Sequence, residues 1–229
     1  MLHGFLPSLL QGALLTLSLA LASLGVAMVL GLVACFAKIS RNRLARWPAQ
    51  WYTTVVRGIP DLVLVLLVFY GGQVLVNDLA AAWGREDPID VDPLTAGVLT
   101  IGFIFGAYLA EAFRGAYLAV PPGQREAALA YGMSPWQAAW RVQLPQMMRH
   151  ALPGISNNWL VLIKSTAVVS VIGLDDLMKR GGDAAGATKE PFVFFLAVAL
   201  IYLLFTSLSE AFFAWAQRKL AIGVRQGVL

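Results

Sequence analysis

One lysine inside a long apolar run is the residue of this sequence whose type and position are most unusual. The run reads ISNNWLVLIKSTAVVSVIGL, residues Ile155–Leu174, and Lys164 stands near its centre. A lysine at the middle of a bilayer costs about 2.5 to 3.5 kcal/mol on insertion scales, so its side chain should face protein or water. Asn157 lies seven residues before it, which places both side chains on one face of a helix.

The same run carries further amide and hydroxyl groups. Asn158 precedes Ser165 by seven residues, and Thr166 and Ser170 extend the polar strip. Such groups form hydrogen bonds between helices worth around 0.6 kcal/mol each, or they line a route for a polar solute. Both interpretations stay open for the amides and hydroxyls, whereas for the lysine a translocation route or its gate is favoured.

A polar interval, Glu126–Pro145, reads EAALAYGMSPWQAAWRVQLP and carries the signals of two short helices. Gly132 follows a stretch of helix formers, at the place where a left-handed C-terminal cap falls. Ser134 is suited to cap a second helix, with Pro135 at its first position and Gln137 completing a capping box. The interval therefore predicts a helix, a glycine turn and a second helix, within a hairpin at about 121–150.

The second helix of this hairpin is expected to end near Leu144–Pro145. The first helix carries small residues, Ala127, Ala128 and Ala130, which allow close approach by another surface. Glu126 offers a carboxylate to a basic partner. A generic amphipathic hairpin lying on the bilayer is the alternative interpretation.

Several kinds of reactive centre are excluded. Cys35 is the only cysteine, and His3 and His150 are the only histidines, so no metal site is expected. Gly181 and Gly186 have the glycine spacing of a phosphate-binding loop, but alanine stands where that loop needs lysine. No Ser/His/Asp triad or carboxylate pair stands out, so we expect no catalytic residues in this chain.

The elements that must position these residues are membrane helices. Hydrophobic residues make up 59% of the chain and charged residues 13%, against roughly 25% charged in soluble domains. Five apolar stretches are long enough to cross a bilayer as helices, in a single domain that spans residues 1–229. The expected spans are Leu10–Ala37, Ile59–Val76, Leu94–Phe113, Ile155–Leu174 and Phe192–Trp215.

The basic residues predict how the spans are oriented. The intervals after the first and third spans and the C-terminal tail, which includes Arg225, are rich in lysine and arginine. The interval after the second span holds Arg85 as its one basic residue, among acids that include Glu86. The positive-inside rule therefore places the N-terminus in the periplasm and the C-terminus and the hairpin in the cytoplasm. No basic cluster with interleaved aromatics indicates nucleic-acid binding.

Two acids near span ends have open interpretations. Asp61 begins the second span, where a helix N-terminus favours a carboxylate, and a substrate or gating role is the alternative. Glu111 and Arg114 are three residues apart and should pair on one helical face.

The spacing of the hairpin resembles the EAA motif of binding-protein-dependent ABC importer permeases. The pattern is EAA, three residues, Gly, nine residues and Val-x-Leu-Pro, where the usual motif ends Ile-x-Leu-Pro and Val142 replaces the isoleucine. In that family the hairpin docks in a groove of a cytoplasmic ATPase. The residues that the resemblance assigns to this docking are Glu126, Ala127, Ala128, Gly132, Leu144 and Pro145.

The resemblance covers nearly the whole chain and looks like the polar amino acid branch of the family. Three stretches carry it, RGIPDLVLVLLVFYGGQ, FGAYLAEAFRGAYLAVPPGQREAA and NNWLVLIKSTAVVSVIGLDDL. The most similar pattern is the Q-type subunit of histidine/lysine/arginine/ornithine and arginine/ornithine importers. The resemblance implies an all-α permease of the bacterial inner membrane, with an ATPase dimer that binds ATP-Mg, a second permease subunit and a periplasmic substrate-binding protein. It implies no cofactor in this chain.

One departure bears on the partner subunit. Many relatives carry an acid where this chain has Asn158, and often one where it has Ser165. An acid there would suit a cationic side chain. Its absence implies that a non-identical, M-type permease subunit supplies that charge. The alternatives are a permease for a neutral or acidic amino acid, and a channel or ion-coupled transporter that acts alone.

Overall fold

The structure is a computed structural model that describes residues 4–85, 87 and 89–220. His3, Glu86 and Arg225 lie outside these residues. The described chain is helical, and no strand occurs in it. Its elements are α1 (Leu6–Ile39), α2 (Arg43–Gly58), α3 (Asp61–Ala82), α4 (Pro93–Ala119), α5 (Pro122–Ala130), α6 (Pro135–Ala138), the π-helical turn η1 (Ala139–Gln143), α7 (Leu144–Ser165), the 3₁₀ segment η2 (Thr166–Ile172), α8 (Leu177–Thr188) and α9 (Pro191–Leu220).

Five helical stretches are long and apolar enough to cross a membrane, as the sequence predicts. They are α1, α3, α4, the continuous run from α6 to η2, and α9. Each stretch extends past the predicted apolar run at one end or both. Helix α3 begins at Asp61, two residues later than expected, and ends later, at Ala82. Asp61 is thus the first residue of its helix, where the helix-terminus interpretation puts it.

The core is built on the contact between α1 and α4, the most extensive one in the described chain. Glycines let the two backbones approach, since a β-carbon at Gly102 would stand 2.6 Å from Cβ of Val26. One at Gly106 would stand 2.9 Å from Cβ of Leu30. Lipid supplies no hydrophobic force between helices, so close packing through small residues is what holds such a pair together.

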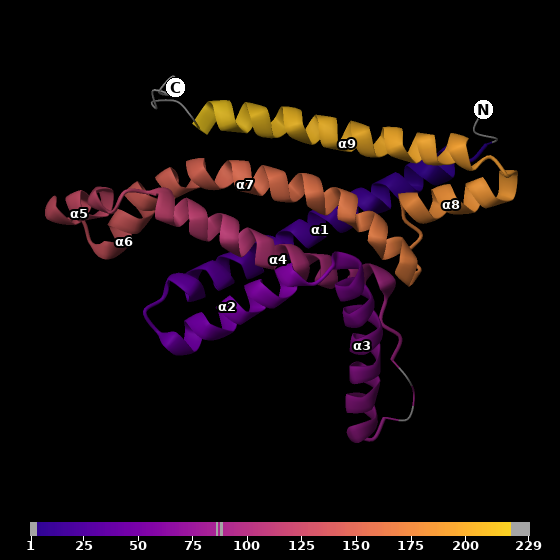
Figure 1. Ribbon diagram of the computed structural model, residues 1–229, viewed down its shortest axis with the longest axis horizontal. Coiled ribbons are helices and arrows are strands. Elements are labelled where there is room, and N and C mark those ends of the chain that lie inside the picture. Colours follow the sequence, from indigo (N-terminus) through magenta and orange to yellow (C-terminus); the bar gives the residue numbers. More distant parts are fainter. Residues whose placement is uncertain (1–3, 86, 88, 221–229) are drawn as a thin grey trace.

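The other helices assemble around α4. It also contacts α7, α2 and α3, and α9 packs against α7 and α8 (Figure 1). Figure 1 shows α3 projecting away from the remaining helices, and much of its apolar surface is exposed. The α5–α6 hairpin and the end of α9 lie at one end of the molecule, and α8 with the start of α1 lies at the other (Figure 1).

The prediction that the second helix of the hairpin ends near Leu144–Pro145 is wrong. The chain passes from α6 through η1 directly into α7, so hairpin and fourth span form one helical run of 38 residues, Pro135–Ile172. The amide of Leu144 donates to the carbonyl of Ala139, five residues back. Pro145 follows directly after this wide turn, in the first turn of α7.

The fourth span also differs at its other end. It was expected as one regular helix to Leu174, but it tightens into η2 after Ser165 and ends at Ile172. Gly173, with φ of +94°, then turns the chain in the left-handed conformation that glycine adopts without strain.

Two amphipathic helices occupy intervals that the sequence analysis left without structure. In α2 the buried residues Ala49, Thr53 and Val56 recur every three or four positions, and the arginines of the helix are exposed. The segment with glycines 181 and 186 forms α8, a helix rather than a phosphate-binding loop.

An ion-pair network ties three helices together at the hairpin end. Arg114 Nε lies 3.1 Å from Glu111 Oε2, which confirms the predicted pair. The other carboxylate oxygen accepts from Lys38 Nζ of α1, and that ammonium also donates to Thr53 of α2. Because Lys38 is 73 residues from Glu111, local spacing could not indicate the contact.

Candidate coupling hairpin and transport surface

The hairpin has the helix–turn–helix form that its sequence predicts. Helix α5 ends at Ala130, and the amide of Met133 then donates to the carbonyl of Ala128. Gly132 has φ of +83°, the left-handed conformation of a C-terminal glycine cap. The turn is therefore fixed by backbone bonds rather than by contacts with the rest of the chain.

The second helix of the hairpin starts with the predicted capping box. Ser134 Oγ accepts from the Gln137 amide at 3.2 Å, and Gln137 Oε1 accepts from the Ser134 amide at 2.9 Å. Two amides that would otherwise lack partners at the helix start are satisfied. Pro135 occupies the first turn.

The residues that the resemblance assigns to the EAA motif divide between the inside and the outside of the hairpin. Glu126, Ala127 and Gly132 are exposed, whereas Ala128 is buried together with Ala138 of α6. Ala128 thus packs within the hairpin, where a larger side chain would push the two helices apart. Leu144 and Pro145 stand at the end of η1, Leu144 half-buried and Pro145 exposed.

Exposed aromatic side chains gather on the hairpin. Tyr131 is 89% exposed and Trp136 is 70% exposed. Trp140 lies with its ring 5.4 Å from that of Trp136, edge to face. Aromatic side chains are enriched in protein interfaces, and a patch at the tip of a polar projection marks a contact surface. The spacing of four residues between the two tryptophans is the sequence signal for this shared face.

The polar strip of the fourth span is only partly assembled on one surface. Asn157 and Lys164 are both exposed on α7, in agreement with their spacing of seven. Asn158 is half-buried, and its amide donates to the carbonyl of Gly154 at 2.8 Å. Ser165 is half-buried. Thr166 is completely buried and donates to the carbonyl of Ile163 at 2.7 Å, so it lies away from that surface.

A tryptophan beside these residues was missed by the sequence analysis. Trp159 is 6% exposed and its indole N–H donates to Ser209 Oγ of α9 at 2.8 Å. The bond fixes α7 against α9 at the level of the polar strip. A buried indole usually needs such a partner, which is the one signal that could have indicated it.

Metal-binding side chains do not cluster in the part of the chain that the structure describes. No group of three or more His, Cys, Asp or Glu residues lies close enough together to hold an ion. What the site offers is a projecting hairpin for protein contact and an exposed α7 face with amide and ammonium groups. Together with five spans, these features are those of a multi-pass membrane protein with a polar face on one of its spans.

Comparison with known proteins gives the same result. Residues 23–222 match the family model of the binding-protein-dependent transport system inner membrane component. The chain is 48% identical, over the full length of both proteins, to the histidine/lysine/arginine/ornithine transport system permease protein HisQ of Escherichia coli (strain K12). It is 41% identical to the nopaline transport system permease protein NocQ of Agrobacterium fabrum, covering 97% of this chain and 94% of that protein.

A solved structure described as an amino acid ABC transporter with histidines superposes with a TM-score of 0.80. Its sequence is 30% identical, and the match covers 94% of this chain and 95% of that one. The chain therefore belongs to the family of binding-protein-dependent transport system inner membrane components. It is a multi-pass protein of the bacterial inner membrane.

Proposed function

We propose that the chain is the Q-type permease subunit of an ATP-driven importer for basic amino acids of the histidine, lysine, arginine and ornithine class. The observation that carries the proposal is the full-length identity of 48% to a permease that is named for these four substrates. The similar solved transporter, described as holding histidines, supports the same class.

The α5–α6 hairpin is the proposed docking site of the cytoplasmic ATPase. Glu126, Ala127 and the Gly132 turn are exposed for this contact, and the aromatic patch adjoins them. The ATPase dimer binds ATP-Mg, and this chain needs no cofactor of its own. In this topology the N-terminus is periplasmic and the hairpin and C-terminus are cytoplasmic, because lysine and arginine gather at the hairpin end.

The exposed face of α7 is the proposed wall of the route. Asn157 and Lys164 face outward from the chain, and Asn158 and Ser165 stand at the edge of that face. Thr166 supports it from inside, since its hydroxyl bonds the α7 backbone. A second, non-identical permease subunit of the M type would face this surface and supply the carboxylate that a cationic substrate requires. A periplasmic binding protein would deliver the substrate.

The coupling is tested by Gly132→Asp. Open space surrounds the position, so an aspartate meets no clash, but it must adopt φ of +83°. Such strain costs of order 1–3 kcal/mol and would deform the turn. We expect the variant to insert in the membrane, to lose co-purification with the ATPase, and to lose ATP-driven uptake of labelled arginine and histidine.

Gly84→Asp is the matched control, since Gly84 has φ of +84°, open surroundings and a place outside the hairpin. It should retain the ATPase. Normal uptake by the Gly132→Asp transporter would defeat the coupling assignment. Uptake of glutamine or glutamate in place of arginine and histidine by the wild-type transporter would defeat the substrate class and leave the coupling intact.

A further inference from the structure

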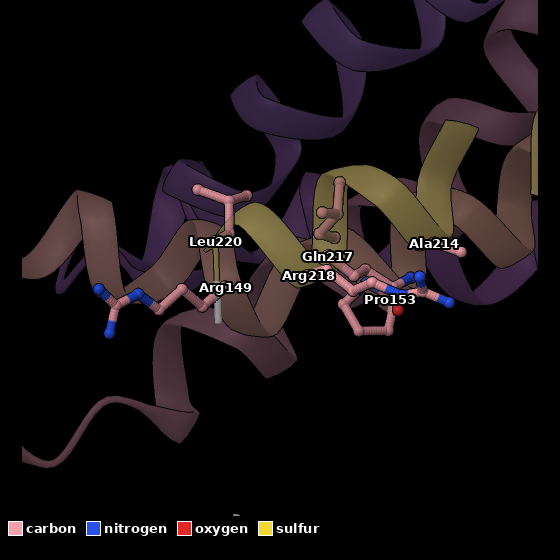
Figure 2. Close-up of a pocket in the computed structure, with 7 residues that line it drawn as sticks. Arg149, Pro153, Ala214, Gln217, Arg218 and Leu220 are labelled. Carbon is pink, nitrogen blue, oxygen red and sulfur yellow. The ribbon is translucent and has the colours of Figure 1, made fainter. Parts of the chain in front are cut away.

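A cavity with a volume of about 340 Å³ lies between α7 and α9 at the hairpin end of the molecule. Helix α7 contributes Arg149, Leu152 and Pro153 to its walls, and α9 contributes Gln217, Arg218 and Leu220. Figure 2 shows the two arginines on opposite sides of the pocket, with the ring of Pro153 beside Arg218 and the guanidinium groups directed away from each other. The arginine stems thus form walls, and the charges stand at the two ends.

The cavity has a local cause in the sequence. Pro153 lies inside α7, and it has no N–H to donate to the carbonyl of Arg149, four residues earlier. A proline ring also crowds that carbonyl and bends the helix away from it. Pro153 itself lines the cavity between α7 and α9.

Two guanidinium groups stand at the ends of the cavity, and nothing in the described chain neutralises their charge. No acidic side chain lines it. Neither Arg149 nor Arg218 forms an ion pair or hydrogen bond with any described residue. Guanidinium groups are donors without acceptor capacity, and their planar fork matches the oxygen atoms of a phosphate or a carboxylate. The cavity is therefore suited to an oxyanion, and beside a membrane the phosphate of a lipid headgroup is the nearest one.

A second cavity continues the seam toward the middle of the span. It has a volume of about 300 Å³ and its walls include Leu24 of α1, Trp159 of α7, and Leu208 and Phe213 of α9. Trp159 lies seven residues from Leu152, and Phe213 lies seven from Leu220, so each helix turns the same face to both cavities. Seven helical residues rise about 10 Å, which is a short way along an acyl chain.

The level of the charged cavity is that of a membrane surface. One turn before Arg218, the ring of Trp215 holds the ammonium of Lys219 at 5.2 Å, and Trp215 is 57% exposed. Exposed tryptophans with adjoining lysines mark the boundary between headgroups and hydrocarbon. Below this level α9 exposes Leu208 and Phe212, at 62% and 59%.

We propose that the α7–α9 seam binds one acidic phospholipid of the leaflet on the hairpin side. Its phosphate lies between Arg149 and Arg218, within reach of the Gln217 amide after rotation of the side chains. One acyl chain occupies the deeper cavity. The bound lipid fills the gap beside Pro153 and fixes the spacing of α7 and α9 beneath the polar strip. The site depends on neither the substrate nor the ATPase.

The test is native mass spectrometry of the purified full chain in detergent, titrated with dioleoyl phosphatidylglycerol or dioleoyl phosphatidylcholine. We expect phosphatidylglycerol to bind more tightly. The Arg149→Gln/Arg218→Gln variant should bind it about thirty-fold more weakly, which corresponds to about 2 kcal/mol for two basic residues. The control Arg43→Gln/Arg46→Gln removes the same charge from exposed positions of α2 and should bind as the wild type does.

Two further arms distinguish the sources of the phosphate. Leu208→Trp fills the deeper cavity and should weaken lipid binding without changing the charged cavity, so unchanged binding overturns the acyl-chain placement. Inorganic phosphate at millimolar concentration should not displace the lipid; displacement would show a site for free anions and overturn the proposal. Equal affinity for the two lipids, or unaltered binding by the double arginine variant, would overturn it as well.

Discussion

The buried carboxyl of Asp176 allows a direct test of how burial changes a pKa, and through it stability, in this fold. The residue is completely buried at the start of α8, at the end of the molecule away from the hairpin. Its Oδ1 accepts from the amide of Lys179 at 2.9 Å, whereas Oδ2 has no partner among the described residues. Burial raises the pKa of this carboxyl from 3.8 to about 6, although the amide bond from Lys179 works against the shift.

The shift makes stability depend on pH in a definite direction. Between about pH 4 and pH 6 the folded protein binds a proton at this site that the unfolded chain has lost, so stability falls as pH rises through the window. A shift of about two pKa units corresponds to about 3 kcal/mol. The destabilisation is fully present above about pH 7 and absent below about pH 4.

Asp176→Asn removes the ionisable carboxyl, and with it this pH dependence, while keeping an oxygen to cap α8. The new amide stands where Oδ2 has no partner, which adds a pH-independent cost of about 1–3 kcal/mol. The informative quantity is therefore the change with pH of the difference in Tm between variant and wild type. At about 2–4 °C per kcal/mol, that difference should shift in favour of the variant by about 6–12 °C between pH 4 and pH 7.5.

The assay is thermal unfolding in lipid nanodiscs, followed by tryptophan fluorescence at several pH values. Asp90→Asn, at an exposed carboxylate between α3 and α4, is the control for loss of one negative charge. A Tm difference for Asp176→Asn that stays constant from pH 4 to pH 7.5 would refute the reasoning. A shift of the opposite sign would show that the carboxylate is stabilised rather than desolvated.

Two further predictions concern the helix contacts at the core. Glu111→Gln should lower the stability of the folded chain by about 2 kcal/mol, because Lys38 is left largely buried without its carboxylate partner. The loss of stability is measured by maleimide labelling of the buried Cys35 on heating at pH 7. A labelling curve that coincides with that of the wild type would contradict this. Gly102→Ala should lower Tm or prevent folding, because its β-carbon would stand 2.6 Å from a valine side chain of α1. The control Gly115→Ala places its β-carbon where no atom lies within 4 Å, so it should raise Tm slightly. Equal effects of the two alanines would show that α1 and α4 are not closely packed.

Short-range rules account for what the sequence predicts correctly. The five spans follow from runs of apolar residues, because a lipid environment leaves the backbone few alternatives to a helix. The Gly132 turn and the Ser134 capping box depend on residues within four positions of each other. The pair of Glu111 and Arg114 follows in the same way from their spacing on one helical turn.

What the sequence does not predict depends on contacts between distant segments. Pro145 indicates a helix end by the local rule, yet packing of Met147 and Ala151 in the core keeps the run helical, with a π turn to accommodate the proline. The spacing of Thr166 places it on the polar strip, but in the structure it begins the 3₁₀ segment η2 and its side chain is buried. Ala128 was assigned to a partner surface by resemblance and is buried in its own hairpin, where its size serves internal packing.

The π turn has a consequence for how the two ends of the long helical run are related. A π turn contains one residue more than the α-helix it interrupts, and one residue corresponds to about 100° of rotation. The direction in which Trp136 and Trp140 point is therefore set, relative to the face with Lys164, by a single extra residue in Ala139–Gln143. Removing that residue would leave every other side chain unchanged, but it would rotate the downstream helix by about 100° relative to the hairpin. The relative orientation of the hairpin and the Lys164 face therefore depends on the number of residues between them, not on which residues these are.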